Sequence, residues 1–280
     1  MSDVLTCVVC ALPIEARVII DYYRLRRDTQ SPWPLYLNDN MVLIVSGVGQ
    51  SAAANACGYL AGRFLASGNN TLNWLNVGIA GHLQADRGAI FVADKIVEAS
   101  SHRVFYPALL FDRPLASSEV ITYDAPQEQY PDNALCDMEA FAFFSSAVRY
   151  SPLELVQVIK VVSDNIQVGV EFIDKTSVVE WVGDGLDLIA AVRDQQFALA
   201  SEWVAGTGES SVLKYLHQFD MQYRLTHYEK NELRQLLQRY IALEQDESWL
   251  AENLTTHKAK KELLRALRIK LDQSEVVFQC

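Results

Sequence analysis

The chain has 280 residues, of which 50% are apolar and 21% are charged, so it can bury a sizeable core and wholesale disorder is excluded. Its 35 acidic and 24 basic residues give a formal net charge of −11. This balance argues against a nucleic-acid backbone or an anionic membrane as a principal partner.

Short β-branched segments alternate with helical patterns over the first 165 residues. A helix is expected at Pro13–Arg27, and a second one, rich in small residues, at Gln50–Ala66. Buried strands are expected at Val4–Leu12, Met41–Val45, Leu72–Val77, Ile90–Ala99 and Leu155–Val162. The alternation predicts an α/β fold with a mixed, mostly parallel sheet flanked by helices, whose ligands lie beyond the carboxyl ends of the strands.

The remaining segments have a different character. Residues 100–133 contain four prolines and one strand-like stretch, Glu119–Tyr123, so a long irregular connection is expected there. Beyond Gly183 the pattern predicts helices at Leu186–Val204, Tyr228–Leu243 and Thr256–Leu271, the last of them basic and amphipathic. We therefore predict two domains, residues 1–205 and a helical C-terminal extension over residues 206–280.

The cysteines and the apolar segments bear on compartment and cofactors. Cys7 and Cys10 form a C-x-x-C, but inside a strand they point to opposite faces, which favours buried thiols over a metal or redox site. Residues 41–62 carry no charge, but their glycines and polar residues indicate strand, loop and helix rather than a membrane span. No basic stretch precedes the first apolar run. We expect a cytoplasmic protein with no metal and no cofactor.

Four clusters of polar residues or glycines follow the predicted strands. Each of them has a structural explanation as a turn, a helix cap or a partner of the helix dipole, and a functional one as a ligand or a catalytic acid. The clusters are Glu15 in the first helical turn, the glycine turns Ser46–Gly49 and Gly78–Gly81, the pair Met138-Glu139 beside Asp137, and Ser163-Asp164.

In this order the clusters resemble the nucleoside phosphorylase/nucleosidase superfamily, and within it the methylthioadenosine/S-adenosylhomocysteine nucleosidases. The resemblance covers about residues 3–205. It implies a three-layer fold around a partly closed mixed sheet, usually assembled as homodimers or higher homo-oligomers. The motifs of this chain that carry it read Ala11-Leu-Pro-Ile-Glu15, Ser46-Gly-Val-Gly49, Gly78-Ile-Ala-Gly81-His82, Met138-Glu139 and Ser163-Asp164.

The same resemblance implies a role for each acid. Glu15 would activate water, Met138 with Glu139 would hold the ribose, and Asp164 would protonate a purine base at N7. This division of labour suits a glycosidic bond that breaks through an oxocarbenium-like sugar, with one acid on each side of it. The further residues assigned to substrate binding are Gly49, Ala80, Gly81 and Ser163.

Water is favoured over phosphate as the nucleophile. Phosphorylases of this superfamily carry an Arg in the first-helix turn, where this chain has Glu15, and a carboxylate repels phosphate. Arg17, Lys160 or Arg87 could bind phosphate only in a rearranged pocket.

This chain also departs from the family pattern. Only 38 residues separate Ala99 from Met138, without the family's Ser-Gly-Asp segment and base-stacking aromatic residue. Tyr123 or Phe172 could supply that stacking surface. His82 replaces the second glycine of the Gly-x-Ala-Gly-Gly turn and could contact substrate or be structural. The last 75 residues could cover the pocket, form a subunit interface or recruit a partner.

The leading hypothesis is a hydrolase that cleaves the N-glycosidic bond of an adenosine-type purine nucleoside, either unmodified or substituted at the 5′ position. Two alternatives stay open: a non-catalytic nucleoside-binding or regulatory protein, and a phosphate-dependent nucleoside phosphorylase.

Overall fold

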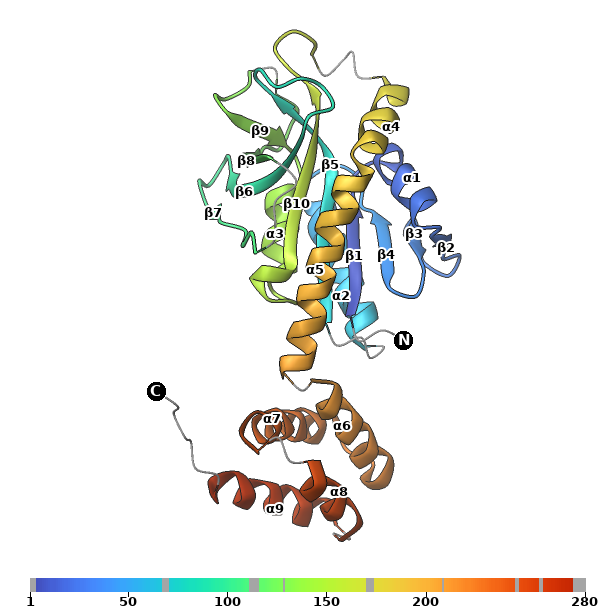
Figure 1. Ribbon diagram of the computed structural model, residues 1–280, viewed down its shortest axis with the longest axis vertical. Helices are drawn as coiled ribbons and strands as arrows, with labels where there is room; N and C mark the ends of the chain where they lie inside the picture. The colour runs from blue at the N-terminus through green and yellow to red at the C-terminus, as the bar shows by residue number, and fades with distance from the viewer. Residues whose placement is uncertain are drawn as a thin grey trace. The chain divides into compact units, whose positions relative to one another are not determined.

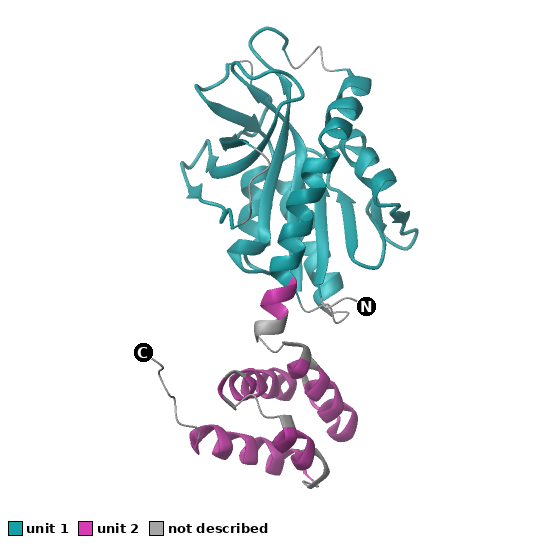
Figure 2. Cartoon of the chain, viewed as in Figure 1, with its two compact units in different colours: residues 1–200 teal, residues 201–280 magenta. Residues whose placement is uncertain are grey.

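The computed structural model describes residues 4–66, 71–110, 116–127, 129–169, 174–207, 209–244, 247–256 and 259–273. The chain forms two compact units, residues 1–200 and 201–280 (Figure 2). Helix α5 (Leu186–Thr207) contributes to both units.

Within the described residues, unit 1 contains a single ten-stranded sheet (Figure 1). The strands are built largely from Val, Leu, Ile and other apolar residues, as expected for strands covered on both faces. They are β1 (Val4–Cys10), β2 (Arg26–Arg27), β3 (Leu35–Leu37), β4 (Met41–Val45), β5 (Thr71–His82), β6 (Ile90–Glu98), β7 (Val104–Phe105), β8 (Ala116–Thr122), β9 (Ala134–Asp137) and β10 (Val156–Asp164).

The sheet is mixed, as expected, but it is not clearly mostly parallel, because parallel and antiparallel pairings occur equally often among the described strands. The central strands β4, β1, β5 and β10 are parallel neighbours. Strand β5 is long enough that its last residues, Gly81 and His82, also pair antiparallel with β9. Strands β9, β8 and β6 then lead back to β10, which pairs antiparallel with β6. The sheet is therefore mixed and partly closed, as in a barrel.

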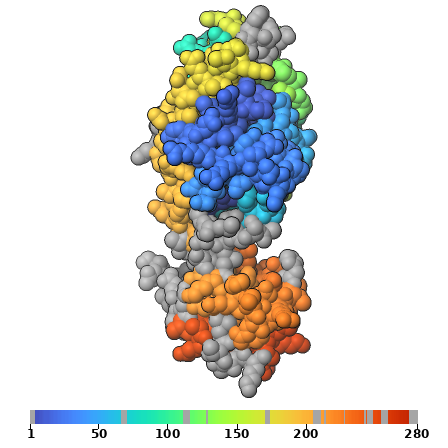
Figure 3. Space-filling view, turned by 90° about the vertical axis from the view of Figure 1, so that its right-hand side faces the viewer, coloured from blue at the N-terminus to red at the C-terminus, as the bar shows by residue number. Residues whose placement is uncertain are grey.

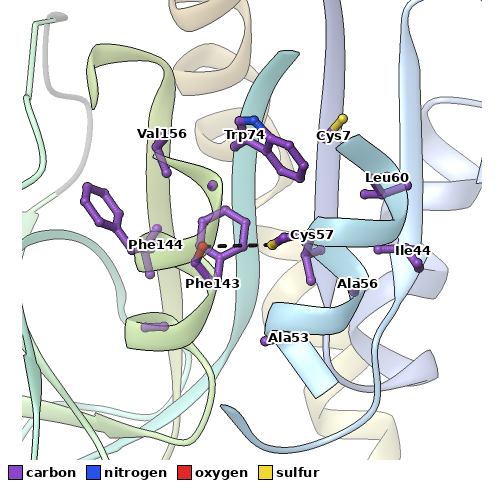
Figure 4. Close-up of a cluster of buried hydrophobic side chains, with 14 of the residues drawn as sticks. Cys7, Ile44, Ala53, Ala56, Cys57, Leu60, Trp74, Phe143, Phe144 and Val156 are labelled. Carbon is purple, nitrogen blue, oxygen red and sulfur yellow. Dashed lines mark hydrogen bonds between the residues drawn. The ribbon is translucent and has the colours of Figure 1, made fainter. Parts of the chain in front are cut away.

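Helices cover both faces of this sheet, which gives unit 1 three layers (Figure 1). One face packs against α2 (Gln50–Ala66) and α3 (Ala140–Ala147), and in this layer the Cys57 thiol of α2 contacts the Phe143 carbonyl of α3 (Figure 4). The other face packs against α1 (Pro13–Tyr22), α4 (Lys175–Asp184) and α5. Cys7 and Cys10 are buried on opposite faces.

The space-filling view shows how the N-terminal segments contribute to the surface of unit 1. Residues coloured blue, from α1 to β3, gather on one face beside the yellow residues of α4 (Figure 3). No helix in the described part of the chain is long and apolar enough to cross a bilayer.

Unit 2 is helical and has its own core, which includes Phe219, Leu237 and Tyr240. Its helices are α6 (Glu209–Tyr223), α7 (His227–Glu244), α8 (Glu247–Thr256) and α9 (Lys260–Gln273). The leucines of the basic helix α9 are buried in that core. Helices α6 and α8 were not expected from the sequence.

Candidate active site

Closure of the sheet brings the carboxyl ends of β1, β5, β9 and β10 to one edge. In the register of the sheet Gly81 is paired with Asp164 on one side and with Cys136 on the other. A cavity of about 220 Å³ opens at this edge. The predicted site residues that line it are Glu15, Ala80, Gly81, Met138, Glu139, Ser163 and Asp164.

Glu15 lies in the first turn of α1, yet its side chain is only 2% exposed. One carboxylate oxygen accepts a hydrogen bond from the Leu12 N–H at 2.7 Å, and the other accepts one from the Ile79 N–H at 3.0 Å. Burial raises the pKa of Glu15 to about 7 even though these N–H groups and Lys160 act in the opposite direction. Glu15 therefore caps its helix and is also a carboxyl group that titrates near neutral pH inside the cavity.

Gly78 makes room for this arrangement. A Cβ atom at position 78 would lie 3.2 Å from Glu15 Oε1 and 3.4 Å from Lys160 Nζ. Any side chain there would press against both charged groups. The absence of a side chain thus lets the acid and the amine approach the same stretch of β5 backbone.

Glu139 is the N-cap residue of α3, but its side chain makes no capping hydrogen bond. Its Oε1 accepts a hydrogen bond from the Gly49 N–H at 2.7 Å, across 90 residues of chain. Gly49 has a φ of +101°, a backbone conformation that favours glycine, and it does not itself line the cavity. Burial raises the pKa of Glu139, with Asp137 adding to the effect and Lys160 opposing it.

Asp137 provides the cap that Glu139 does not. Its Oδ2 accepts hydrogen bonds from the N–H groups of Glu139 and Ala140, at 3.2 and 2.7 Å, and its Oδ1 accepts one from the Thr122 hydroxyl at 2.6 Å. Lys160 Nζ lies 2.8 Å from Asp137 Oδ2, and both side chains are almost fully buried. The helix-cap interpretation of the Asp137–Glu139 cluster therefore applies to Asp137.

Lys160 is the buried cation of the site. Burial alone would lower its pKa, but the negative charges of Asp137, Glu139 and Glu15 outweigh burial and raise it. The ammonium group therefore stays charged below the cavity and compensates for the acids around it. Neither its sequence position, in the middle of an apolar strand, nor any motif singled it out for this role.

Asp164 ends β10 and is 6% exposed. One of its oxygens accepts a hydrogen bond from the Ser163 hydroxyl, and Oδ2 accepts one from the Tyr130 hydroxyl at 2.5 Å. The described residues 165–169 that follow it form no helix, and α4 begins at Lys175 with Asp174 as its N-cap. The helix-cap interpretation of Asp164 is therefore wrong, and this carboxylate faces the cavity.

Of the two aromatic residues that the sequence offered as a stacking surface, the structure tests only Tyr123. Tyr123 does not line the cavity, and Phe172 lies outside the described residues. Tyr130, which the sequence did not single out, does line it. His82 has a structural role: its Nδ1 accepts hydrogen bonds from the N–H groups of Gln84 and Ala85.

The cavity offers little to an anion or a metal ion. None of the described residues that line it is Arg, Lys or His. Arg17 is exposed, and Arg87 is also exposed, with its guanidinium over the ring of Trp181. Among the described residues, no group of three or more His, Cys, Asp or Glu side chains is arranged to hold a metal ion.

Comparison with solved structures defines the class of fold. The chain shares its fold with solved structures of methylthioadenosine/S-adenosylhomocysteine nucleosidases, as the sequence motifs predicted. No protein-family model and no curated protein matches the chain.

Three of the similar structures illustrate the extent of the likeness. The Streptococcus pneumoniae nucleosidase in complex with 8-aminoadenine has a TM-score of 0.55 and 17% identity over 67% of this chain and 98% of its own. The Arabidopsis thaliana 5′-methylthioadenosine nucleosidase has a TM-score of 0.55 and 17% identity, over 68% of this chain and 95% of its own. The Neisseria meningitidis nucleosidase in complex with methylthio-immucillin-A has a TM-score of 0.55 and 16% identity, over 69% of this chain and 100% of its own. At these identities the likeness establishes a shared fold.

Proposed function

We propose that unit 1 hydrolyses the N-glycosidic bond of an adenosine-type purine nucleoside, unmodified or 5′-substituted, and releases the free base. The observation that carries this proposal is that Glu15, Glu139 and Asp164, which are far apart in the sequence, line one cavity. Solved structures of the same fold support it, since they hold 8-aminoadenine and methylthio-immucillin-A.

The three acids suit three different tasks. Glu139 accepts hydrogen bonds from the ribose hydroxyls, and Met138 packs against the sugar. Asp164 donates a proton to N7 of the departing base, so that the base leaves uncharged. Glu15, with a pKa raised to about 7 by burial, accepts a proton from water as the water attacks the anomeric carbon.

Water rather than phosphate is the proposed nucleophile. Among the described residues, four carboxylates line the cavity, and the buried ammonium group of Lys160 is already paired with Asp137 beneath it. These carboxylates would repel a phosphate dianion, and none of the described residues that line the cavity has a cationic side chain to bind it. A phosphate-dependent phosphorylase is therefore the weaker alternative.

A second candidate function, a nucleoside-binding protein without turnover, is favoured by one observation. The Tyr130 hydroxyl already donates a hydrogen bond to Asp164 Oδ2, the oxygen that a base would approach. Such a protein would bind nucleosides through Glu139 and release no base.

The wider setting belongs to the same proposal. We infer a cytoplasmic protein that assembles as a homodimer or higher homo-oligomer, with a nucleoside-cleaving domain over residues 1–205 and a helical extension over residues 206–280. The family resemblance of the motifs and the separate core of unit 2 support this organisation.

A panel of nucleosides tests the proposed function. Purified protein is incubated with adenosine, 5′-methylthioadenosine, inosine and uridine, with and without inorganic phosphate in excess over nucleoside, and free bases are separated chromatographically. We expect adenine from the adenosine-type substrates at a rate that phosphate does not change. Base release that requires phosphate would support the phosphorylase, and calorimetric binding without any release would support the binding protein.

A further inference from the structure

Both oxygens of Asp164 already have hydrogen-bond partners inside the cavity. Ser163 donates to Oδ1 and Tyr130 donates to Oδ2. A ligand that is to receive a proton from Asp164 therefore approaches an oxygen at which one of these hydroxyl groups already stands.

The two donors differ in how easily they can leave. Ser163 is buried in the central strand β10, where its hydroxyl also lies 3.4 Å from the Ala80 carbonyl oxygen. Tyr130 is half-buried on the connection between β8 and β9. The side chain that can move away from Asp164 without disturbing the sheet is Tyr130.

The contacts of Tyr130 also resemble those that a bound base would make. A Cβ atom on Gly81 would collide with Cε1 of the Tyr130 ring and would lie 2.6 Å from Asp164 Oδ2. A flat aromatic ring therefore lies directly on the Gly81 backbone with a polar atom directed at the proposed general acid. This is the position that a planar heterocycle must take if Asp164 is to protonate it.

We propose that Tyr130 is an internal occupant of the base subsite, which the substrate's base displaces from Asp164, and that this exchange sets the affinity for the base. The inference rests on the proposed function, since it takes the ligand to be a nucleoside. Tyr130 is a positioning residue in this account, because it acts through Asp164 and leaves before the bond breaks.

The exchange has a chemical consequence. The Tyr130 hydroxyl donates a hydrogen bond to the Asp164 carboxylate, whereas an unprotonated ring nitrogen can only accept a hydrogen bond. As the base replaces the tyrosine, Asp164 must take up one proton from solvent, and it then gives that proton to the base as the glycosidic bond breaks. The hydroxyl of Tyr130 is thus a competitor of the base and supplies no proton to it.

Calorimetric titration with adenine tests this inference without requiring turnover. Tyr130→Phe removes the hydroxyl and keeps the ring, and it should bind adenine about tenfold more tightly than the wild type, since a hydrogen bond to a charged group no longer has to be broken. Tyr123→Phe is the matched control, because Tyr123 lies on the same connection but outside the cavity lining, and its affinity should not change. The KM for nucleoside should fall in Tyr130→Phe with kcat changed little.

Several results would overturn the inference. If Tyr130→Phe binds adenine no more tightly than the wild type, the hydroxyl does not compete with the base. If Tyr130→Phe and Tyr130→Leu both bind adenine more weakly, Tyr130 is a fixed wall against which the base stacks. A crystal structure with adenine bound and Tyr130 still hydrogen-bonded to Asp164 would contradict the exchange directly.

The design separates this inference from the proposed function. Tighter adenine binding by Tyr130→Phe in a protein that releases no base would support the exchange and contradict hydrolysis. Normal base release with unchanged adenine affinity in Tyr130→Phe would support hydrolysis and contradict the exchange.

Discussion

Single residues in this site carry a structural and a proposed chemical task at the same time. Glu15 accepts the Leu12 N–H at the start of α1, as the helix-dipole interpretation of its position requires, and it also lines the cavity with a pKa raised to about 7 by burial. Asp137 and Glu139 divide these tasks, since the first caps α3 and the second is bound by a glycine N–H at the cavity wall. A carboxylate beside a helix start is therefore compatible with either task until its burial is known.

The titration of Glu15 gives a prediction for the pH dependence of activity. The proposed base works only when ionised, so kcat for adenine release should increase with pH through a midpoint near 7. This increase of kcat with pH should be absent in Glu15→Gln, and the residual kcat of that variant should be lower than that of the wild type by about 10²- to 10⁴-fold. The measurement is the pH profile of adenine release at saturating nucleoside.

The control for that profile is His82→Asn, which removes a nearby imidazole and keeps an acceptor for the local N–H groups. Its pH profile should match that of the wild type. If the rise with pH is lost in His82→Asn but kept in Glu15→Gln, the titrating group is His82, which contradicts the prediction.

Lys160 gives a second prediction at this scale. Replacing it by Met leaves Asp137, Glu139 and Glu15 buried without a compensating cation, which should lower the free energy of unfolding by about 3–5 kcal/mol at pH 8. The deficit should shrink as the pH falls through 7, because Glu15, whose pKa burial raises to about 7, then takes up a proton. Urea denaturation at several pH values measures both effects.

A surface pair provides the comparison for Lys160. Lys95 also forms an ion pair, with Glu119, but both side chains are partly exposed, so Lys95→Met should change stability little and without this pH dependence. Equal losses in the two variants would show that the buried network contributes no more than a solvated pair.

At the scale of the elements, local patterns predicted most strands but not how they pair. Apolar runs predicted β1, β4 and β5 because buried strands are nearly continuous in Val, Leu and Ile. Strand β9 has four residues and no pattern of its own, yet its antiparallel pairing with β5 turns the sheet into a partly closed one. Pairing direction depends on contacts between distant segments, so the sequence did not reveal it.

The same distinction applies to the candidate site. The acids could be predicted because each stands in a short motif after a strand, and the structure brings Glu15, Glu139 and Asp164 together. Lys160 and Tyr130 could not, since one lies within an apolar strand and the other in a proline-rich connection. What makes them part of the site is closure of the sheet, which no local pattern encodes.

Helix α7 offers a prediction for an element. It begins with a capping box: the Thr226 hydroxyl accepts a hydrogen bond from the Glu229 N–H at 3.3 Å, and the Glu229 carboxylate accepts one from the Thr226 N–H at 2.8 Å. Thr226→Ala should therefore lower the stability of unit 2 by about 1 kcal/mol. Chemical denaturation followed by far-UV circular dichroism measures the loss.

An exposed position on the same helix distinguishes capping from general helix effects. Gln235→Ala lies on α7 away from its ends and should leave stability unchanged or slightly higher, because Ala is the better helix former. A loss in Gln235→Ala as large as that in Thr226→Ala would contradict the capping explanation.

At the scale of the whole molecule, each unit has its own core, and the cavity draws its described lining from unit 1 alone. A chain ending at Thr207 should therefore fold, bind adenine and release base with a kcat/KM within about threefold of the full chain. Calorimetry and base-release assays on both chains measure this. Loss of adenine binding in a folded truncated chain would show that the helical extension completes the site.

The measurement that tests the central claim most directly is single-turnover release of adenine from 5′-methylthioadenosine in phosphate-free buffer, by the wild type, Glu15→Gln and Asp164→Asn. Three acids that act on one glycosidic bond predict a complete turnover for the wild type and a rate lower by about 10²- to 10⁴-fold in each variant, with nucleoside binding retained. Unchanged turnover in both variants, or no turnover by the wild type with the enzyme in excess over nucleoside, would contradict the account.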